Sequence, residues 1–390
     1  EHYGIFEENG KLHLYVKAID QVIPDFIRFE NVADAGDSYD FSPLEGDREI
    51  FSQEVDAVSV AGFAGADFME VKHILNIPVN LDERKAGKRS KELVILTRFE
   101  LRKGENFIRV EHKIDNNAKD HRVRMLLQTS LALPDYSFAD QGFSLIQRPA
   151  VNPYMKNWKE KKFAEAPVPI YPLENLAGVT SGEVTAAVIT KGIKEYQVIG
   201  ETGELALTLF RSVGMLGRDH LAWRPGRASG INNKVVYTPD AQMQGKMTFQ
   251  YAIYFSKKFN ETQLFDTVDM YRGHKISYQK QTLNTFEERL DRFEIPYPAD
   301  VLPSRLSLLE ITNGDVFFSS MKKAHDEESL ILRLFNPHNK EQSFTIVSKH
   351  AQSIKQTSLN EKRLLDVKEG VTIVPKGYVT LKLDMKGNLQ

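Results

Sequence analysis

Residues 33–43 of the sequence gather three carboxylates and one phenol hydroxyl. Asp34, Asp37, Tyr39 and Asp40 stand close together there, among Gly, Ser and Pro residues that favour turns. Composition alone favours an ordinary turn over a loop that presents Tyr39 and the acids to a polar ligand such as a sugar. Paired carboxylates also serve as general acid and base, but only where the fold brings them together in space.

A second segment, residues 211–230, combines glycines with arginines. Arg224 and Arg227 carry guanidinium forks that bind carboxylate, phosphate or vicinal hydroxyls through two hydrogen bonds at once. Trp223 beside them offers a face for stacking or packs against its neighbours. The residues alone leave two interpretations equally open, a ligand-binding loop and an exposed loop with solvated arginines.

The sequence contains no pattern of a complete catalytic or metal site. It has no cysteine, which excludes thiolate zinc sites and thiol nucleophiles. His-x-His, His-x-Asp and His-Glu-x-x-His do not occur, nor do the P-loop and the Gly-x-Ser-x-Gly elbow. His112 lies on the apolar face of an expected strand, where we predict a hydrogen-bonded core histidine. We therefore assign no catalytic residue and no metal ligand to this chain.

Charge and composition narrow the classes of partner. The 51 Lys and Arg residues balance the 53 Asp and Glu residues, so the chain lacks the basic surplus that nucleic-acid binding requires. No apolar run approaches the roughly 18 residues that suggest a membrane span. The 23 Phe and 14 Tyr residues suffice for a large core. We expect a folded protein with neither a nucleic acid nor a membrane as partner.

The elements that must position the two segments are expected to be antiparallel strands. Residues 107–114 alternate apolar and polar side chains, and residues 123–131 do the same, so we predict a hairpin closed by the turn at 115–120. No alternation of strands and helices occurs, which favours sheets packed face to face. The further strand-like runs are residues 12–16, 71–77, 93–101, 184–189, 205–210 and 247–255.

Two stretches interrupt the strand pattern. Residues 147–176 are rich in proline and contain Trp158, which predicts an ordered excursion between strands. Further on, Asn260 and Gln263 resemble a capping box, and apolar residues at helical spacing up to 293 predict two short helices.

After Pro303 the predicted strands become short and regular, which is typical of a smaller sandwich. These strands are residues 316–321, 330–335, 344–347, 371–374 and 379–383. The predicted fold class is all-β. A large antiparallel β-supersandwich (1–257) is followed by a helical linker packed on it (258–296) and a small C-terminal β-sandwich (297–390).

Five segments of the chain resemble glycoside hydrolase family 38, the α-mannosidases, and especially its bacterial branch of mannosylglycerate hydrolase-like enzymes. The segments keep their order over most of the chain, and that order is similar to only the C-terminal half of the family. They are residues 33–43, 148–160, 210–233, 238–242 and 319–337.

The resemblance implies that the catalytic machinery lies upstream of this chain. Family members carry an N-terminal α/β barrel with a zinc ion held by His and Asp, an aspartate nucleophile and an acid/base carboxylate, and they retain configuration through a covalent intermediate. The zinc motif and the barrel pattern do not occur here, so we expect no cofactor in this chain and zinc in the upstream domain. The first residue is Glu rather than Met, and we expect the chain to be the back half of a longer protein.

The resemblance also bears on the two loops. Family members send a tyrosine-bearing loop and an arginine-bearing loop from the β-domain to the bound mannoside. Tyr39 matches the tyrosine, and Arg227 matches the arginine, with Arg224 as its rival. The resemblance implies that Asp34, Asp37 and Asp40 shape the loop rather than perform chemistry.

We therefore predict the C-terminal region of a retaining, zinc-dependent α-mannosidase that is inactive alone. Its expected partners are the α-mannoside substrate and the N-terminal catalytic domain. An autonomous carbohydrate-binding module is the first alternative, because the large sandwich is similar in kind to the mutarotase-like domains that bind sugars. The other is a purely structural or oligomerisation domain, since family members often form homo-oligomers. The absence of cysteine and of a leader favours a cytoplasmic bacterial protein.

Overall fold

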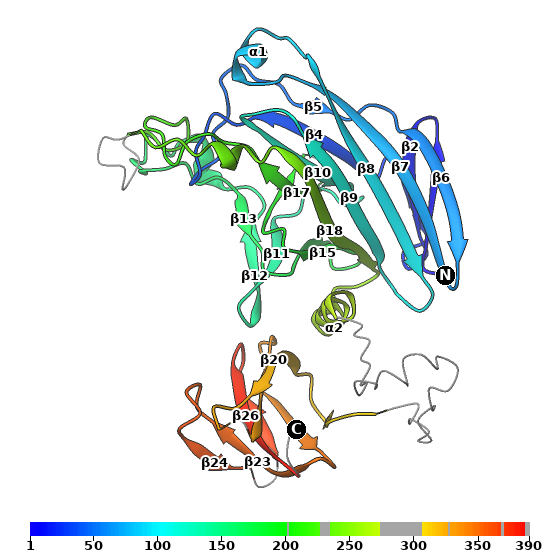
Figure 1. Ribbon diagram of the computed structural model, residues 1–390, viewed down its shortest axis with the longest axis vertical. Helices are drawn as coiled ribbons and strands as arrows, with labels where there is room; N and C mark the ends of the chain where they lie inside the picture. Colours follow the sequence, from blue (N-terminus) through cyan, green and yellow to red (C-terminus); the bar gives the residue numbers. More distant parts are fainter. Residues whose placement is uncertain (201–202, 227–234, 274–305, 327, 368–369, 387–390) are drawn as a thin grey trace, which may run out of the picture. The chain divides into compact units, whose positions relative to one another are not determined.

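A computed structural model describes residues 1–200, 203–226, 235–273, 306–326, 328–367 and 370–386, the side chain of residue 57 excepted (Figure 1). The chain divides into two compact units, Glu1–Tyr271 and Arg272–Gln390. The predicted boundary near Pro296 and the second predicted helix lie outside the described residues, and so does Arg227. Within the described ranges, no helix is long and apolar enough to span a membrane.

The first unit is built from antiparallel sheets, as the alternating sequence pattern predicts. The nine-stranded sheet has the order β12 (Ser144–Pro149), β11 (Tyr136–Gln141), β14 (Leu176–Thr180), β15 (Thr185–Lys191), β18 (Gly245–Ser256), β9 (Ile108–Asn116), β8 (Lys91–Arg102), β7 (Ala66–Ile77) and β6 (Asp56–Phe63). The six-stranded sheet has the order β13 (Ile170–Pro172), β16 (Glu195–Ile199), β17 (Glu204–Arg211), β10 (His121–Leu127), β4 (Ile27–Ala33) and β5 (Ile50–Phe51). A third sheet holds β1 (Tyr3–Glu8), β2 (Lys11–Val16) and β3 (Gln21–Ile23).

One apolar core joins these sheets. It takes inward-facing residues from strands of each sheet, such as Val110 of β9, Val123 of β10 and Leu14 of β2. The inward residues of β9 alternate with outward charged ones, and this alternation is the period-two pattern of the sequence. The all-β sandwich architecture is confirmed.

The predicted hairpin between residues 107–114 and 123–131 is wrong. Strand β9 pairs with β8 and β18, whereas β10 pairs with β4 and β17 in the other sheet. The connection between them therefore crosses from one layer to the other instead of folding back. Alternation reports which face of a strand is buried and carries no information on the partner strand, which explains the error.

His112 is a core histidine, as predicted. Its Nδ1 lies 2.9 Å from Thr97 Oγ1 and its Nε2 lies 2.8 Å from the hydroxyl of Tyr251. The ring also packs edge-on against Phe29, with 5.0 Å between the centroids. Burial holds the pKa of His112 well below its ordinary value, so the ring stays neutral in the core.

Helix α2 (Glu261–Arg272) covers part of the nine-stranded sheet. The amide of Gln263 donates to Asn260 Oδ1 over 3.1 Å, which satisfies one free N–H of the first turn. Leu264 and Val268 lie on one face and pack in a cluster with Phe107, the residue before β9. Three short one-turn segments, α1 (Leu81–Lys85), η1 (Pro153–Lys156) and η2 (Pro239–Gln242), lie in connections within the described part of the same unit. Segment η1 belongs to the proline-rich excursion.

The second unit is a small β-sandwich with its own core. Its three-stranded sheet has the order β19 (Glu310–Thr312), β22 (Gln342–Val347) and β25 (Val371–Ile373). Its five-stranded sheet has the order β20 (Phe317–Lys323), β21 (Ser329–Phe335), β26 (Tyr378–Met385), β23 (Ala351–Thr357) and β24 (Leu364–Asp366). The five predicted strands are present here, while β19, β23 and β24 carry too few apolar residues in alternation to have been predicted.

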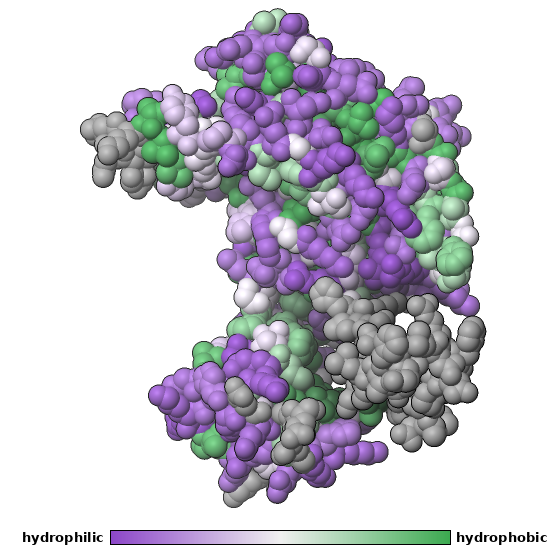
Figure 2. Space-filling view, in the orientation of Figure 1, coloured by the Kyte–Doolittle hydropathy of each residue, from purple (hydrophilic) through white to green (hydrophobic). Residues whose placement is uncertain are grey.

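Strand β6 forms one edge of the nine-stranded sheet. Val60 is 74% exposed and Phe63 79% exposed, and Figure 2 shows hydrophobic surface along this side of the unit. Edge strands of this kind are often blunted by lysine, proline or a bulge, and β6 has only an irregularity at Asp56. This edge is therefore open to pairing with another strand.

A buried ion pair lies between neighbouring strands of the six-stranded sheet. Arg124 of β10 donates to Glu30 of β4 through Nε over 2.6 Å and through Nη2 over 3.0 Å, and its Nη1 donates to Gln197 over 2.7 Å. Both charged side chains are almost fully buried. Because a buried charge that loses its partner is strongly unfavourable, the pair matters for stability even where its net contribution is small.

We expect Glu30→Ala to lower the free energy of unfolding by about 3–5 kcal/mol, because Arg124 is left buried without its partner. Urea unfolding followed by tryptophan fluorescence measures the change. Glu70→Ala is the matched control, because Glu70 forms an exposed 4.0 Å pair with Arg98 and its loss should change little. Equal effects of the two substitutions would contradict the assignment.

Candidate functional site

The order of strands in the six-stranded sheet brings the two loops singled out in the sequence to the same edge. Both β4 and β17 pair antiparallel with β10, one on each side, so β4 and β17 run in the same direction. Their carboxyl ends therefore lie about 10 Å apart, two strand spacings. The loop after β4 (34–43) and the loop after β17 (212–226) leave the sheet side by side, although Asp34 and Arg211 are 177 positions apart in the sequence.

The loop 34–43 is folded by its own aspartates. Asp34 Oδ1 accepts from the amide of Gly36 over 2.9 Å, and Asp37 Oδ1 accepts from the amides of Tyr39 and Asp40 over 3.0 and 2.9 Å. These are Asx turns, in which a carboxylate takes the place of a backbone acceptor. A Cβ atom at position 36 would lie 2.0 Å from the carbonyl oxygen of Asp40, so the turn requires glycine there.

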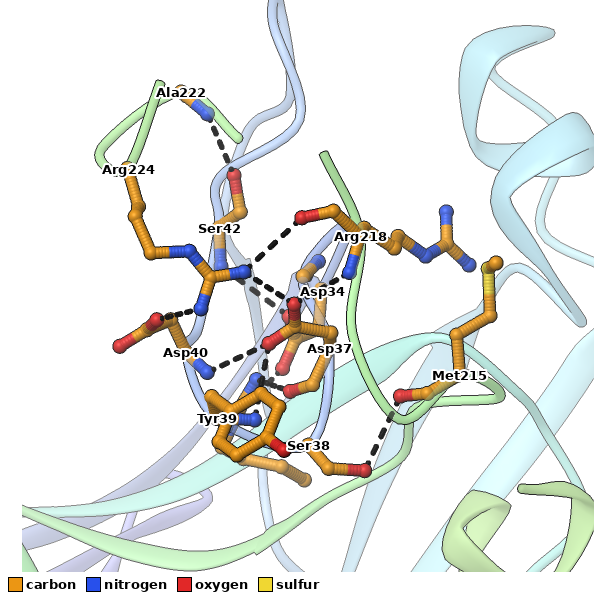
Figure 3. A network of polar contacts seen from close by, with 12 residues as sticks. Asp34, Asp37, Ser38, Tyr39, Asp40, Ser42, Met215, Arg218, Ala222 and Arg224 are labelled. Carbon is orange, nitrogen blue, oxygen red and sulfur yellow. Dashed lines mark hydrogen bonds and ion pairs between the residues drawn. The ribbon is translucent and has the colours of Figure 1, made fainter. Parts of the chain in front are cut away.

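The remaining oxygens of Asp34 and Asp37 bind the second loop. Arg211, the last residue of β17, donates from Nε to Asp34 Oδ2 over 2.7 Å and from Nη2 to the carbonyl of Asp37 over 2.9 Å. The amide of Arg218 donates to Asp37 Oδ2 over 2.7 Å. Figure 3 shows Asp37 between the two loops with contacts to both. We refer to residues 34–43 and 211–226 together as the loop pair.

Arg224 closes the loop pair from the other side (Figure 3). Its Nη2 donates to Asp37 Oδ2 over 2.5 Å and to the carbonyl of Arg218 over 3.1 Å, while its Nη1 donates to Asp40 Oδ2. The guanidinium predicted to contact a ligand is therefore engaged with two aspartates. Its rival Arg227 lies outside the described residues.

The two buried aspartates differ in their protonation behaviour. Burial is the largest influence on both and raises the pKa of Asp34 above its ordinary value, despite the ion pair with Arg211. For Asp37, the hydrogen bonds from Asp40, Arg218 and Arg224 together outweigh burial and lower the pKa. Asp37 is thus held as a carboxylate, and a carboxylate is what its four N–H donors require.

Tyr39 is the most exposed aromatic residue of the loop pair. Its amide is fixed by Asp37, yet its side chain is 56% exposed. The guanidinium of Arg224 lies 6.0 Å from the centre of the Tyr39 ring. A rigid turn that carries an exposed phenol at its tip is suited to hydrogen-bond a ligand outside the loop.

A pocket of about 250 Å³ adjoins Tyr39 on the outer face of the six-stranded sheet. Its floor consists of Ile170, Glu195 and Arg211, from three neighbouring strands. Three segments form its walls, and their lining residues are Tyr39 to Phe41 of the first loop, Trp223 and Arg224 of the second, and Glu165 to Val168 of the proline-rich excursion. We call this space the sheet pocket. It is slightly smaller than the range of about 300–1,000 Å³ typical of drug-sized ligands, so it fits one small molecule.

Sequence reasoning missed Phe41, Glu195 and a buried arginine behind them. Arg122 of β10 stacks on the Phe41 ring, with 3.6 Å between the guanidinium carbon and the ring centre. Its Nε and Nη1 are buried without a hydrogen-bond partner among the described residues. Burial lowers its pKa to about 9, so Arg122 is charged at neutral pH. The sequence did hold one signal of this buried charge, since arginines occupy two alternate positions, 122 and 124, of an otherwise apolar strand.

The described residues contain no group of three or more His, Asp or Glu side chains that could hold a metal ion. Two of the buried histidines illustrate the reason. Both ring nitrogens of His112 are engaged by Thr97 and Tyr251, and both ring nitrogens of His121 by Asn31 and Asn116. The resemblance implies zinc in the upstream domain, and no metal chemistry is assigned to the described residues.

Comparison with known families gives two matches that together cover most of the described strands. Residues 5–215 match the family described as the C-terminal domain of glycosyl hydrolases family 38. Residues 315–385 match the family described as the C-terminal beta sandwich domain of the same hydrolases.

Individual relatives are distant and longer. A protein of Halalkalibacterium halodurans named "Putative mannosylglycerate hydrolase" is 24% identical over 381 residues, which cover 91% of this chain and 38% of the relative. A crystal structure of an alpha-mannosidase from Enterococcus faecalis V583 aligns with a TM-score of 0.74 at 20% identity, over 98% of this chain and 41% of the other. A second Enterococcus faecalis structure, of a protein in glycosyl hydrolase family 38, gives 0.68 at 20% identity and covers 98% and 43%. The chain thus spans about two fifths of these relatives, and the structures show a shared fold.

We expect Asp37→Asn to lower the free energy of unfolding by about 2 kcal/mol at pH 7, because it removes the charge that Arg224 and three amides bind. The pKa of Asp37 is lower in the folded than in the unfolded chain. Its stabilisation is therefore complete above the ordinary pKa of aspartate, about 4, and is lost as the pH falls through the lower folded value.

Thermal unfolding from pH 2 to pH 7 measures this difference. The gap between wild type and Asp37→Asn should close in acid. Asp25→Asn is the control, because Asp25 forms only an exposed 3.6 Å pair with Lys11 and should show little difference at any pH. A gap for Asp37→Asn that stays constant down to pH 2 would speak against the assignment.

Proposed function

We propose that this chain, which belongs to the C-terminal domains of the family 38 glycosyl hydrolases, is the β-domain portion of an α-mannosidase-type hydrolase. In this proposal a separate catalytic domain cleaves the α-mannoside, and the chain completes the sugar site. The observation that carries the proposal is the loop pair, which folds around buried aspartates and presents Tyr39 to solvent beside a pocket.

The comparisons support this proposal in two ways. The relatives bear the names of an alpha-mannosidase and a mannosylglycerate hydrolase. They are also more than twice as long as the part that matches, which leaves room for a catalytic domain. The zinc ion and the retaining mechanism implied by the resemblance belong to that domain in this proposal.

The residues of this chain would act by binding and orientation. The hydroxyl of Tyr39 both donates and accepts hydrogen bonds, so it pairs with a sugar hydroxyl in either sense. Arg224 keeps Asp37 and Asp40 in place and thereby fixes the turn that carries Tyr39. Holding a substrate in the reactive geometry contributes to rate even when the contacting group takes no part in bond making.

An autonomous carbohydrate-binding module is the second candidate. The observation in its favour is that the sheet pocket is formed within the first unit alone, by residues between Tyr39 and Arg224. A purely structural or oligomerisation role is the third, and the exposed edge strand β6 is the feature that suits it. Hydrolytic activity of the longer protein, and its dependence on Tyr39, separate these functions.

We expect Tyr39→Phe in the full-length protein to lower kcat/KM for an aryl α-mannoside about tenfold, because one hydrogen bond to the sugar is lost while the ring remains. Tyr136→Phe is the matched control, since Tyr136 is 57% exposed on β11, away from the loop pair. Its kcat/KM should equal that of wild type. An unchanged kcat/KM for Tyr39→Phe would remove Tyr39 from the site and favour the structural role.

The 390-residue chain alone should not release nitrophenol from p-nitrophenyl α-D-mannopyranoside, with or without added zinc. The expectation follows from the proposal that the nucleophile and the zinc ligands belong to another domain. A time course at high protein concentration, with a chelator-treated sample as control, checks it. Zinc-dependent turnover by this chain would overturn the proposed division of labour.

A further inference from the structure

We infer that the sheet pocket is a binding subsite for an uncharged pyranoside, such as a second sugar unit next to the one that Tyr39 contacts. This inference rests on the proposed function for the place of the subsite in a reaction. The ligand class itself follows from the lining of the pocket, since aromatic faces, hydrogen-bond acceptors and a surplus of negative charge meet there.

Aromatic side chains form one part of the lining. Tyr39, Phe41 and Trp223 all border the pocket, and Phe41 meets Trp223 edge-on with 5.5 Å between the ring centroids. Arg122 stacks under Phe41, so the Phe41 ring is held from below. Rigid aromatic side chains suit the apolar face of a pyranose ring, because both surfaces are flat and little side-chain freedom is lost on contact.

Carboxylates form the other part. Glu165 and Glu195 both line the pocket. Glu195 accepts from the hydroxyl of Thr208 through Oε1 over 2.6 Å, which leaves its Oε2 for a ligand. Glu165 is exposed and forms no hydrogen bond through its side chain in the described part of the chain. Sugar hydroxyls are donors that carboxylate oxygens accept well, and such charge-assisted bonds are about twice as strong as neutral ones.

The charge balance argues against an anionic ligand. The lining holds the carboxylates of Asp40, Glu165 and Glu195 against the guanidinium groups of Arg211 and Arg224. Both guanidiniums are already bound to aspartates of the loop pair. A phosphate or carboxylate group would therefore meet the carboxylates of Glu165 and Glu195, while each guanidinium of the lining already has a carboxylate partner. This disfavours a phosphorylated or glycerate-bearing group in this subsite.

The same balance also disfavours a cation. An amine in the pocket would be attracted by Glu165 and Glu195, but it would also lie near the guanidinium of Arg122 under Phe41, whose Nε and Nη1 have no hydrogen-bond partner among the described residues. Neutral hydroxyls use both kinds of group without the cost of removing a charge from water. An uncharged pyranoside therefore fits the lining better than its charged analogues.

Intrinsic fluorescence tests the inference on the 390-residue chain, because it contains only two tryptophans. Trp223 borders the pocket, whereas Trp158 is 6% exposed. We expect methyl α-D-mannopyranoside to change the emission saturably with a dissociation constant of about 1–10 mM, near the weak end of specific binding. Mannose 6-phosphate, which adds about 1.5 to 2 negative charges at pH 7, and mannosamine, which adds a positive one, should bind at least about tenfold more weakly.

Substitutions assign the response to the pocket. The emission change should persist in Trp158→Phe and disappear in Trp223→Phe. Glu195→Gln should weaken binding of the neutral mannoside about tenfold, because a charge-assisted hydrogen bond becomes a neutral one. Glu174→Gln removes a charge outside the pocket, where Glu174 pairs with Lys194, and should bind as wild type does.

The inference is overturned if no neutral pyranoside gives a saturable response. It is also overturned if mannose 6-phosphate or mannosamine binds more tightly than the neutral mannoside. Calorimetry on the same samples covers the case of binding without an emission change.

Its failure is distinct from failure of the proposed function. If the full-length protein hydrolyses mannosides but the pocket binds no pyranoside, only the subsite assignment is removed. Binding of the mannoside by a protein without hydrolytic activity removes only the proposed enzyme role.

Discussion

Buried charge holds the candidate site together. Asp34 and Asp37 have no exposed surface, and a carboxylate in that position is unfavourable unless donors surround it. Several of those donors come from the end of β17 and the loop after it, above all Arg211 and the amide of Arg218. Neither loop can keep its shape without the other, because each supplies the groups that the other needs. The position of Tyr39 is a consequence of this mutual dependence.

The topology makes the dependence possible, and the topology could not be read from the sequence. Alternation predicted the strand at residues 107–114 and placed His112 in the core, since burial on one face leaves a period-two signal. The same signal led to the wrong partner strand for residues 123–131, because alternation does not report in which sheet, or next to which strand, a strand lies. Only the strand order shows that β4 and β17 end at one edge, with their loops in contact.

Composition flagged both members of the loop pair but missed the floor of the pocket. Asp34 and Tyr39 stood out because acids, turn formers and an aromatic residue rarely coincide in so short a run. Glu195 did not, because it is a single acid at the start of an ordinary strand. Arg122 and Arg124 lie on a strand whose residues are all buried, and Phe41 of the first loop covers Arg122. A charged residue in such a strand marks a covered face, which is where a site can form.

The sequence of the loop 34–43 was open to three interpretations: a turn, a ligand-binding loop, and a pair of catalytic acids. General acid–base catalysis needs a carboxyl group that reaches the ligand and titrates near the working pH. Asp37 is held ionised by its donors, and Asp34, whose pKa burial raises, is sealed from solvent. Their chemistry is directed inward, to the loop that holds Tyr39. Glu165 and Glu195, on other segments, border the same pocket as Tyr39 and have carboxylate oxygens left to accept hydrogen bonds from a ligand. A single arrangement thus separates the groups that keep the site in shape from those that face what it binds.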